Sequence, residues 1–207
     1  MNKIADNIWV LALCAAGFSA GILNDAQADT IAFTPTLSPN GSGVGNDGLF
    51  FTPTTAISVT ALGYVDCGFT VGHDVGLYDV TTSLLLASTT VTISSTPDSG
   101  FYYNLITPIS LTAGDEYAVV GTQVASDSNW TADSIITAPE ITYDGYQYDY
   151  SATLDLPTIT YGTAYFGPNF QYTVAFEPVP EPTVFSGFLL GLGVLFCLRG
   201  LKFGRGI

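Results

Sequence analysis

The sequence predicts an all-β fold, an antiparallel β-sandwich of jelly-roll type, placed between two apolar terminal segments. Short runs rich in β-branched and aromatic residues recur along the middle of the chain. Clusters of Gly, Pro, Asn, Asp and Ser separate these runs and predict turns. No stretch between Asp29 and Phe176 carries a sustained helical apolar stripe. The absence of an internal repeat excludes a propeller or a solenoid.

The charges are distributed very unevenly. The chain has 207 residues, of which 18 are acidic and 4 are basic. No Lys or Arg occurs between Asn7 and Leu198. Nucleic acid would be repelled by such a surface, because its binding depends on neutralising phosphates, and a nucleic-acid partner is excluded. Cys67 is the only cysteine outside the apolar ends, so we expect no disulfide within the domain.

The first segment has the three parts of a secretory signal peptide. Lys3 precedes an apolar run at Ile8–Ala20, and Ala26 and Ala28 form a small-x-small cleavage pattern before Asp29. We therefore expect residues 1–28 to be removed after export and Asp29 to begin the mature chain.

Residues 29–176 are predicted to form one acidic β-sandwich ectodomain. Within it, Ile57–Leu62 shows the alternation of apolar and polar residues that a half-buried strand requires. The Gly-rich stretch from residue 38 to 48 is interpreted as a loop. The remaining strands are expected at Asp29–Thr36, Leu49–Thr52, Asp74–Asp79, Leu84–Ile93, Phe101–Leu105, Glu116–Thr122, Glu140–Tyr150, Thr158–Phe166 and Phe170–Phe176.

The last segment combines a rigid linker, an apolar span and a basic end. Pro180 and Pro182 fix φ and lack backbone donors, so the linker at residues 177–182 cannot continue a helix. Thr183–Leu198 has no ionisable side chain except that of Cys197, and cations follow it. Residues 183–207 are therefore predicted to form a single transmembrane helix with a basic cytoplasmic end and the ectodomain outside.

Val-Pro-Glu-Pro, the Gly- and Leu-rich span and the basic end together resemble the PEP-CTERM sorting signal. The resemblance covers Val179–Ile207 and implies processing by an exosortase-type membrane enzyme at the surface of a Gram-negative bacterium that makes exopolysaccharide. It also implies that the chain crosses the inner membrane only transiently. The matching recognition residues are Pro180, Glu181 and Pro182, and the basic end is formed by Arg199, Lys202 and Arg205.

A second resemblance covers about residues 48–122. Val59–Tyr64, His73–Tyr78, Leu84–Ala87 and Leu111–Tyr117 are similar to motifs of an extracellular β-sandwich domain family of unknown function. The resemblance implies a sandwich fold and a surface setting, and it implies no reaction.

Catalytic residues are not expected. His73 is the single histidine, and no Gly-x-Ser-x-Gly elbow accompanies it, so we interpret it as a structural residue. Chance pairs of carboxylates are too common in this acidic chain to indicate a glycosidase. The sequence therefore predicts a protein that is not an enzyme.

Calcium is the one cofactor that the acidic residues suggest. Asp127, Asn129 and Asp133 occur close together in a loop-like stretch, and their oxygens are the ligands that calcium prefers. Their spacing is not that of an EF-hand. The alternative is a solvated acidic surface without a bound ion.

Aromatic residues suggest a glycan platform. Tyr146, Tyr148 and Tyr150 alternate and share one face of a predicted strand, and Trp130 precedes them. Exposed rings at Trp130, Tyr146 and Tyr148 would stack on the apolar faces of sugars. The alternative is that these rings belong to the core or to cross-strand pairs.

The sequence thus predicts a non-enzymatic surface or extracellular-matrix protein with a structural or adhesive role. Its expected partners are an exosortase-type enzyme, the membrane, and exopolysaccharide or other surface proteins. The alternative function is a carbohydrate-binding module that recognises a specific glycan.

Overall fold

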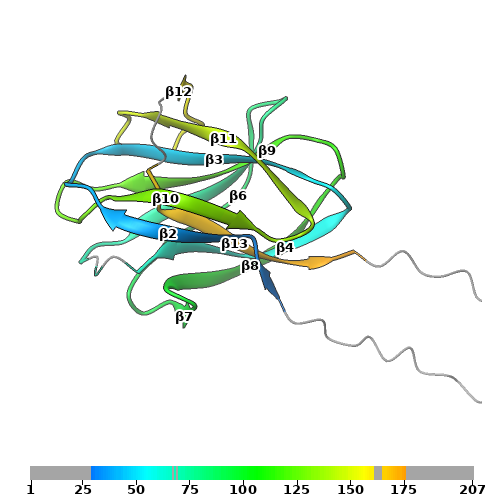
Figure 1. Cartoon of the computed structure of the whole chain (residues 1–207), viewed down its shortest axis with the longest axis horizontal. Helices are drawn as coiled ribbons and strands as arrows, with labels where there is room; N and C mark the ends of the chain where they lie inside the picture. Colours follow the sequence, from blue (N-terminus) through cyan, green and yellow to red (C-terminus); the bar gives the residue numbers. More distant parts are fainter. Residues whose placement is uncertain (1–28, 67, 69, 161–164, 176–207) are drawn as a thin grey trace, which may run out of the picture.

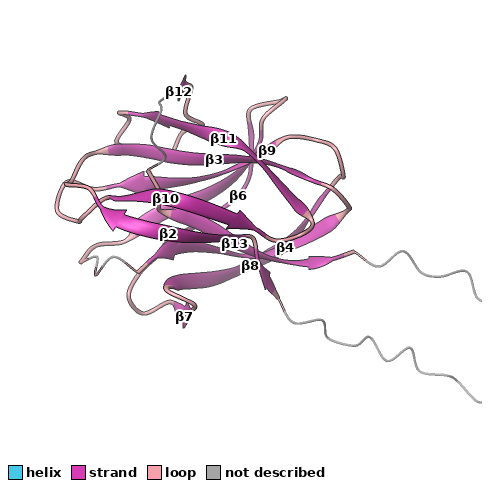
Figure 2. Ribbon diagram, in the orientation of Figure 1, coloured by secondary structure: helices cyan, strands magenta, loops and turns pink. Residues whose placement is uncertain are grey.

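The computed structural model describes residues 29–66, 68, 70–160 and 165–175, and these residues form an antiparallel all-β fold (Figures 1 and 2). The all-β, antiparallel part of the prediction is confirmed. Within the described residues no helix is long and apolar enough to cross a membrane. The predicted signal peptide, linker and transmembrane helix lie outside this part of the chain, as does Cys67.

Two large sheets pack face to face. The first contains, in spatial order, β1 (Thr30–Ile31), β13 (Pro168–Val174), β4 (Ile57–Val65), β8 (Phe101–Leu111) and β7 (Thr96–Asp98). The second contains β12 (Ile159–Thr160), β11 (Ile141–Asp149), β3 (Gly45–Pro53), β9 (Tyr117–Gln123), β5 (His73–Asp79) and β6 (Leu84–Val91). Every pair of neighbouring strands is antiparallel.

A two-stranded sheet of β2 (Phe33–Pro39) and β10 (Trp130–Thr137) lies across the side between the two large sheets (Figure 1). The Ala32 N–H donates to the Phe170 carbonyl at 3.0 Å, which attaches this pair to the first sheet. Pro35 and Pro39 cannot donate to a ladder, and this suits a strand that has a neighbour on one side only.

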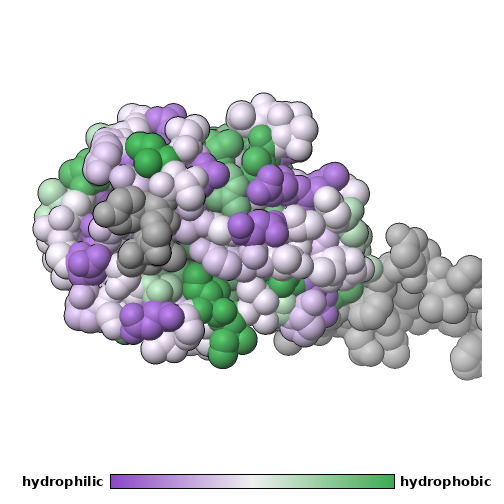
Figure 3. All heavy atoms as spheres, turned by 45° about the horizontal axis from the view of Figure 1, so that its top comes forward, coloured by the Kyte–Doolittle hydropathy of each residue, from purple (hydrophilic) through white to green (hydrophobic). Residues whose placement is uncertain are grey.

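The core is built on aromatic rings. Phe33 of β2, Phe51 of β3 and Phe170 of β13 are fully buried, and each comes from a different sheet. The ring centre of Phe33 lies 6.1 Å from that of Phe51 and 5.8 Å from that of Phe170, in edge-to-face contacts. On the face drawn in Figure 3, hydrophobic residues form separate patches between hydrophilic ones.

Strand β3 begins inside the stretch that the sequence predicted to be a loop. Gly45 and Gly48 are needed there because other chain segments approach the backbone closely. A Cβ at Gly45 would collide with the Asp149 carbonyl oxygen, and one at Gly48 would lie 2.7 Å from the Pro157 ring. The glycines therefore permit close packing in a strand, and they do not indicate a loop.

Two strands were missed in the sequence. Strand β10 was not predicted because its alternation is interrupted by a bulge between Ala132 and Ser134. Strand β7 lies in a stretch that was expected to be a turn. The turn itself is shorter, with positive φ at Ser99 (50°) and Gly100 (84°), and it joins β7 to β8 in a hairpin.

The two ends of the described domain leave from the same side of the molecule. Thr30 of β1 pairs with Tyr172 near the end of β13, and the start of β1 and the end of β13 lie on the same side of the domain in Figure 1. The opposite end of the domain contains the β2–β3 loop and the C-terminal end of β11 (Figure 1).

The aromatic core gives a first prediction. Replacing Phe170 with Ala should lower the free energy of unfolding by about 3–5 kcal/mol, because its ring contacts Phe33, Phe51 and Tyr172. Leu105→Ala is the control, since Leu105 is 81% exposed, and it should change the stability by no more than about 0.5 kcal/mol. Urea denaturation followed by circular dichroism measures both values, and equal stabilities would contradict this description of the core.

Candidate functional site

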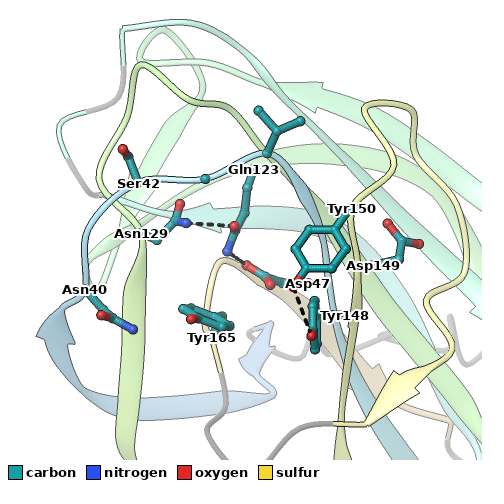
Figure 4. A pocket seen from close by; sticks show the side chains of 11 residues that line it. Asn40, Ser42, Asp47, Gln123, Asn129, Tyr148, Asp149, Tyr150 and Tyr165 are labelled. Atoms are coloured by element: carbon teal, nitrogen blue, oxygen red, sulfur yellow. Dashed lines mark hydrogen bonds between the residues drawn. The ribbon is translucent and has the colours of Figure 1, made fainter.

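A pocket of about 330 Å³ opens at the end of the domain that lies away from the two chain ends (Figures 1 and 4). The β2–β3 loop, the ends of β9 and β11, the residue before β10 and the residue Tyr165 surround it. Its lining residues are Asn40, Ser42, Gly43, Val44, Asp47, Gln123, Asn129, Tyr148, Asp149, Tyr150 and Tyr165. The pocket thus combines phenol rings with amide, hydroxyl and carboxylate groups.

Sheet register brings these segments together. Strand β3 lies between β9 and β11, with Gly45 opposite Gln123 and Asn46 opposite Asp149. Backbone hydrogen bonds also tie the β2–β3 loop to the β9–β10 turn. The Asn40 N–H donates to the Asn129 carbonyl, and the Asn129 N–H donates to the Gly41 carbonyl, both at 2.8 Å. These two bonds hold the start of the loop, and the pairing of Gly45 with Gln123 fixes its end.

A directional chain of hydrogen bonds forms the floor (Figure 4). The Asn129 amide Nδ2 donates to Gln123 Oε1 at 2.8 Å, and Gln123 Nε2 donates to Asp47 Oδ2. The Tyr146 hydroxyl donates to Asp47 Oδ1 at 2.7 Å. Both carboxylate oxygens of Asp47 therefore accept from neutral donors.

Asp47 is only 2% exposed, and this burial dominates its titration. Burial raises the pKa of Asp47 to about 7 from an ordinary value of 3.8. The hydrogen bonds from Tyr146 and Gln123 oppose the rise, and the nearby Asp149 adds to it. The same burial, with Asp47 beside the hydroxyl, raises the pKa of Tyr146 far above its usual range. Tyr146 therefore stays protonated and donates.

Three tyrosines surround the mouth (Figure 4). The rings of Tyr148 and Tyr150 meet edge to face with centres 5.2 Å apart, and their hydroxyls are 3.2 Å apart. Tyr150 is 74% exposed, whereas Tyr148 and Tyr165 are half-buried. The mouth thus presents aromatic surface that is fixed by contacts at its base and open to solvent above.

Asp149 lines the pocket, but its carboxylate is engaged by donors on the far side of β11. Successive side chains of a strand point to opposite faces, so its carboxylate lies on the other side of β11 from Tyr148 and Tyr150. There its Oδ1 accepts from Asn46 Nδ2 at 2.9 Å and from the Ser151 N–H at 2.8 Å. Asp47 is therefore the acid beneath the floor.

The structure places only one of the three residues predicted to bind a glycan in the lining of the pocket. Tyr148 lines the pocket, but Tyr146 is only 6% exposed and lies beneath it. Trp130 is half-buried against the core and does not line the pocket. Tyr150 and Tyr165 complete the mouth in their place. The alternation of tyrosines indicated the shared face correctly, but it could not show how burial changes along the strand.

Four further pocket residues were not singled out in the sequence. Asn40 and Ser42 lie in a Gly-rich loop that has no periodicity, and Asp47 lies in the Gly-rich start of β3. Gln123 is one residue beyond the predicted end of its strand. The sequence carries no local signal for these four residues, because strands that are distant in the chain bring them together.

The three residues predicted to bind calcium face three different partners. The Asp127 carboxylate lies against His73, the Asn129 amide donates to Gln123, and Asp133 accepts from the Ser38 hydroxyl at 2.6 Å. Within the described residues, no three His, Cys, Asp or Glu side chains are placed to share an ion. Calcium binding at these positions stays a prediction.

His73 is buried in a structural cluster. Its Nδ1 lies 2.7 Å from the Thr122 carbonyl oxygen, its Nε2 lies 3.2 Å from Asp127 Oδ2, and its ring stacks on Tyr64 with centres 3.9 Å apart. Asp127 Oδ1 also accepts from the Thr70 N–H and hydroxyl. These contacts hold the β9–β10 turn, which carries Asn129 into the pocket.

No protein-family model matches the chain, and no curated protein matches it. The sorting-signal residues Pro180, Glu181, Pro182, Arg199, Lys202 and Arg205 lie outside the described residues, as do Ala26 and Ala28.

The buried carboxyl of Asp47 gives a prediction about pH. Between about pH 4 and about pH 7 the unfolded chain ionises Asp47 while the folded chain keeps it protonated, so this residue makes stability fall as pH rises through that window. Asp47→Asn should remove this contribution. The stability of the variant relative to wild type should therefore increase by a few kcal/mol from about pH 4 to about pH 8.

Urea denaturation at a series of pH values measures this difference. Asp115→Asn is the matched control, because Asp115 is exposed, and its stability relative to wild type should stay nearly constant. An equally constant difference for Asp47→Asn would show that Asp47 titrates normally in the folded protein.

Proposed function

We propose that the chain is an exported, non-enzymatic surface protein whose domain, a sandwich of jelly-roll type, binds an extracellular polysaccharide through this pocket. Of the two roles predicted from sequence, glycan binding has the stronger support. The observation that carries it is the group of three tyrosines over a floor of amides. A purely structural role in the matrix gives no reason for such a pocket.

The chemistry of the pocket suits a sugar. Phenol rings stack on the apolar C–H faces of a pyranose ring, while hydroxyls and amides exchange hydrogen bonds with its hydroxyl groups. Tyr150 offers exposed ring surface, and the Asn40 and Ser42 side chains are exposed on the facing rim. The pocket volume is at the lower end of the range of about 300–1,000 Å³ seen for small-ligand sites.

Binding without catalysis is supported by the placement of the acids. A glycosidase needs two carboxyl groups that face the scissile bond from opposite sides. Asp47 is buried with both oxygens occupied by donors, and the Asp149 carboxylate faces the other side of β11. His73 is buried against Asp127 and Tyr64.

The position of the pocket supports a surface setting. Strand β13 starts near the pocket end, runs through seven residues, or about 20 Å, and ends where the chain continues toward the proposed sorting signal (Figure 1). A domain attached to a membrane through that end would present the pocket away from the membrane. The chain would be held briefly by residues 183–207 and then processed.

A binding assay tests the pocket. Immobilised exopolysaccharide from the producing organism should retain the purified full chain, and Tyr150→Ala should weaken binding at least about tenfold, as expected when an aromatic stacking contact is lost. Surface plasmon resonance measures the affinity. Tyr102→Ala, a half-buried tyrosine of β8 in the other sheet, is the control and should bind like wild type. Loss of binding in both variants, or in neither, would contradict the proposal.

A second experiment tests processing. In the producing organism, replacing Pro180, Glu181 and Pro182 with Ala should keep the chain at full length in the membrane fraction, because the proposed recognition motif is lost. Mass spectrometry of the intact protein from membrane and extracellular fractions measures this. Glu177→Ala changes an acid just before the motif and should leave processing normal. Release of the triple variant at the normal rate would rule out this motif as the signal.

A further inference from the structure

We infer that the pocket selects uncharged sugar units and rejects acidic polysaccharides that carry uronate, sulfate or phosphate groups. The inference rests on the proposed glycan-binding function and names the ligand class of that same site. It comes from three properties of the pocket, namely its charge, its hydrogen-bonding groups and the rigidity of its floor.

No cation faces the pocket from the described part of the chain. Every Lys and Arg of the sequence is outside the described residues, at positions 3, 199, 202 and 205. The single histidine, His73, is 1% exposed and lies against Asp127. An anionic sugar would therefore lose water at its charged group without gaining an opposite charge. Recognition of carboxylate, sulfate and phosphate usually depends on Arg or Lys.

The carboxylate beneath the floor of the pocket also repels an anionic sugar. Asp47 is buried beneath the pocket, where the low dielectric strengthens its field, and the neutral donors Gln123 and Tyr146 solvate its charge without cancelling it. A second carboxylate in the pocket would meet a like charge whenever Asp47 is ionised. Uncharged hydroxyl groups avoid this cost.

The hydrogen-bonding groups favour hydroxyls for a separate reason. When Asp47 is ionised it accepts only, and in this structure Gln123 directs its Nε2 to Asp47 and its Oε1 to the Asn129 amide (Figure 4). The floor is therefore a fixed series of both donors and acceptors. A sugar hydroxyl can both donate and accept, so it can pair with either kind of group in the pocket. A carboxylate only accepts, so the acceptor oxygens of the pocket would be left without a donor from the ligand.

The test uses matched pairs of polymers. The first pair is a purified uronate polymer, polygalacturonate, and the same polymer after chemical reduction of its carboxyl groups to primary alcohols. The second pair is dextran sulfate and dextran. We expect the purified full chain to bind the uncharged member of a pair at least about tenfold more tightly, at about 0.15 M salt to screen distant charges.

A charge-gain variant connects this selectivity to the pocket. Ser42→Lys places a cation on the exposed rim and should raise the ratio of acidic to neutral polymer affinity several-fold, whatever the loss of the serine hydroxyl does to both affinities. Ser110→Lys is the control. Ser110 is exposed on β8 near the end where the chain leaves the domain, and the same added charge there should change neither affinity.

The outcomes separate the inference from the function on which it rests. The selectivity would be overturned if the acidic member of a pair bound equally or more tightly without calcium. If this binding were also lost in Tyr150→Ala, the proposed glycan binding at the pocket would remain intact. Acidic binding that requires calcium and is abolished by EDTA would also overturn the selectivity, in favour of a bridging ion. If neither pair nor a broad glycan array binds, both the inference and the proposed function fail.

Discussion

The contact among Phe33, Phe51 and Phe170 is the interaction on which the rest of the fold depends. One ring comes from each of the three sheets, so this cluster holds the two large sheets and the β2–β10 pair in one arrangement. No Lys or Arg salt bridge can assist within the described domain, because it contains neither residue. Burial of apolar surface therefore supplies most of the stabilisation. The positions of the pocket residues depend on the packing of these sheets, because β3, β9 and β11 all contribute residues to the pocket.

The lack of cations also decides how the buried and half-buried acids are satisfied. Neutral donors from distant parts of the chain take the place of Lys and Arg. Tyr146 and Gln123 donate to the buried Asp47, and in the same way Tyr172 donates to the half-buried Glu140. These hydrogen bonds fix orientations that a flexible ion pair would leave open, at the cost of a buried charge. The directional floor of the pocket is one result of this constraint.

The fold class was predictable because most of the strands carry their own signal. Alternating apolar residues located β4, and aromatic and β-branched runs located β5, β9 and β13. The pocket was predictable only in part. Tyr148 and Tyr150 share a face for a local reason, the period of a strand, and the sequence shows that directly. The meeting of Asp47 with Gln123 and Tyr146 depends on the order of strands in a sheet, which no local pattern encodes. Gly45 was interpreted as a loop residue for the same reason. The residue that leaves no room for a side chain at Gly45 is Asp149, which is distant in the sequence.

The shape of the pocket and the net negative charge of the domain both favour an uncharged sugar as the ligand of the proposed site. An acidic domain stays soluble and repels acidic polymers over a distance of about one Debye length, so contact with a polysaccharide must come from short-range groups. Those groups are the tyrosine rings and the amide floor, and both act on uncharged sugars without help from a cation. Tyr150, exposed and braced by Tyr148, is the first ring that an approaching chain would meet. Under the proposed function the domain would therefore bind by stacking and hydrogen bonding, while its net negative charge opposes association with acidic neighbours.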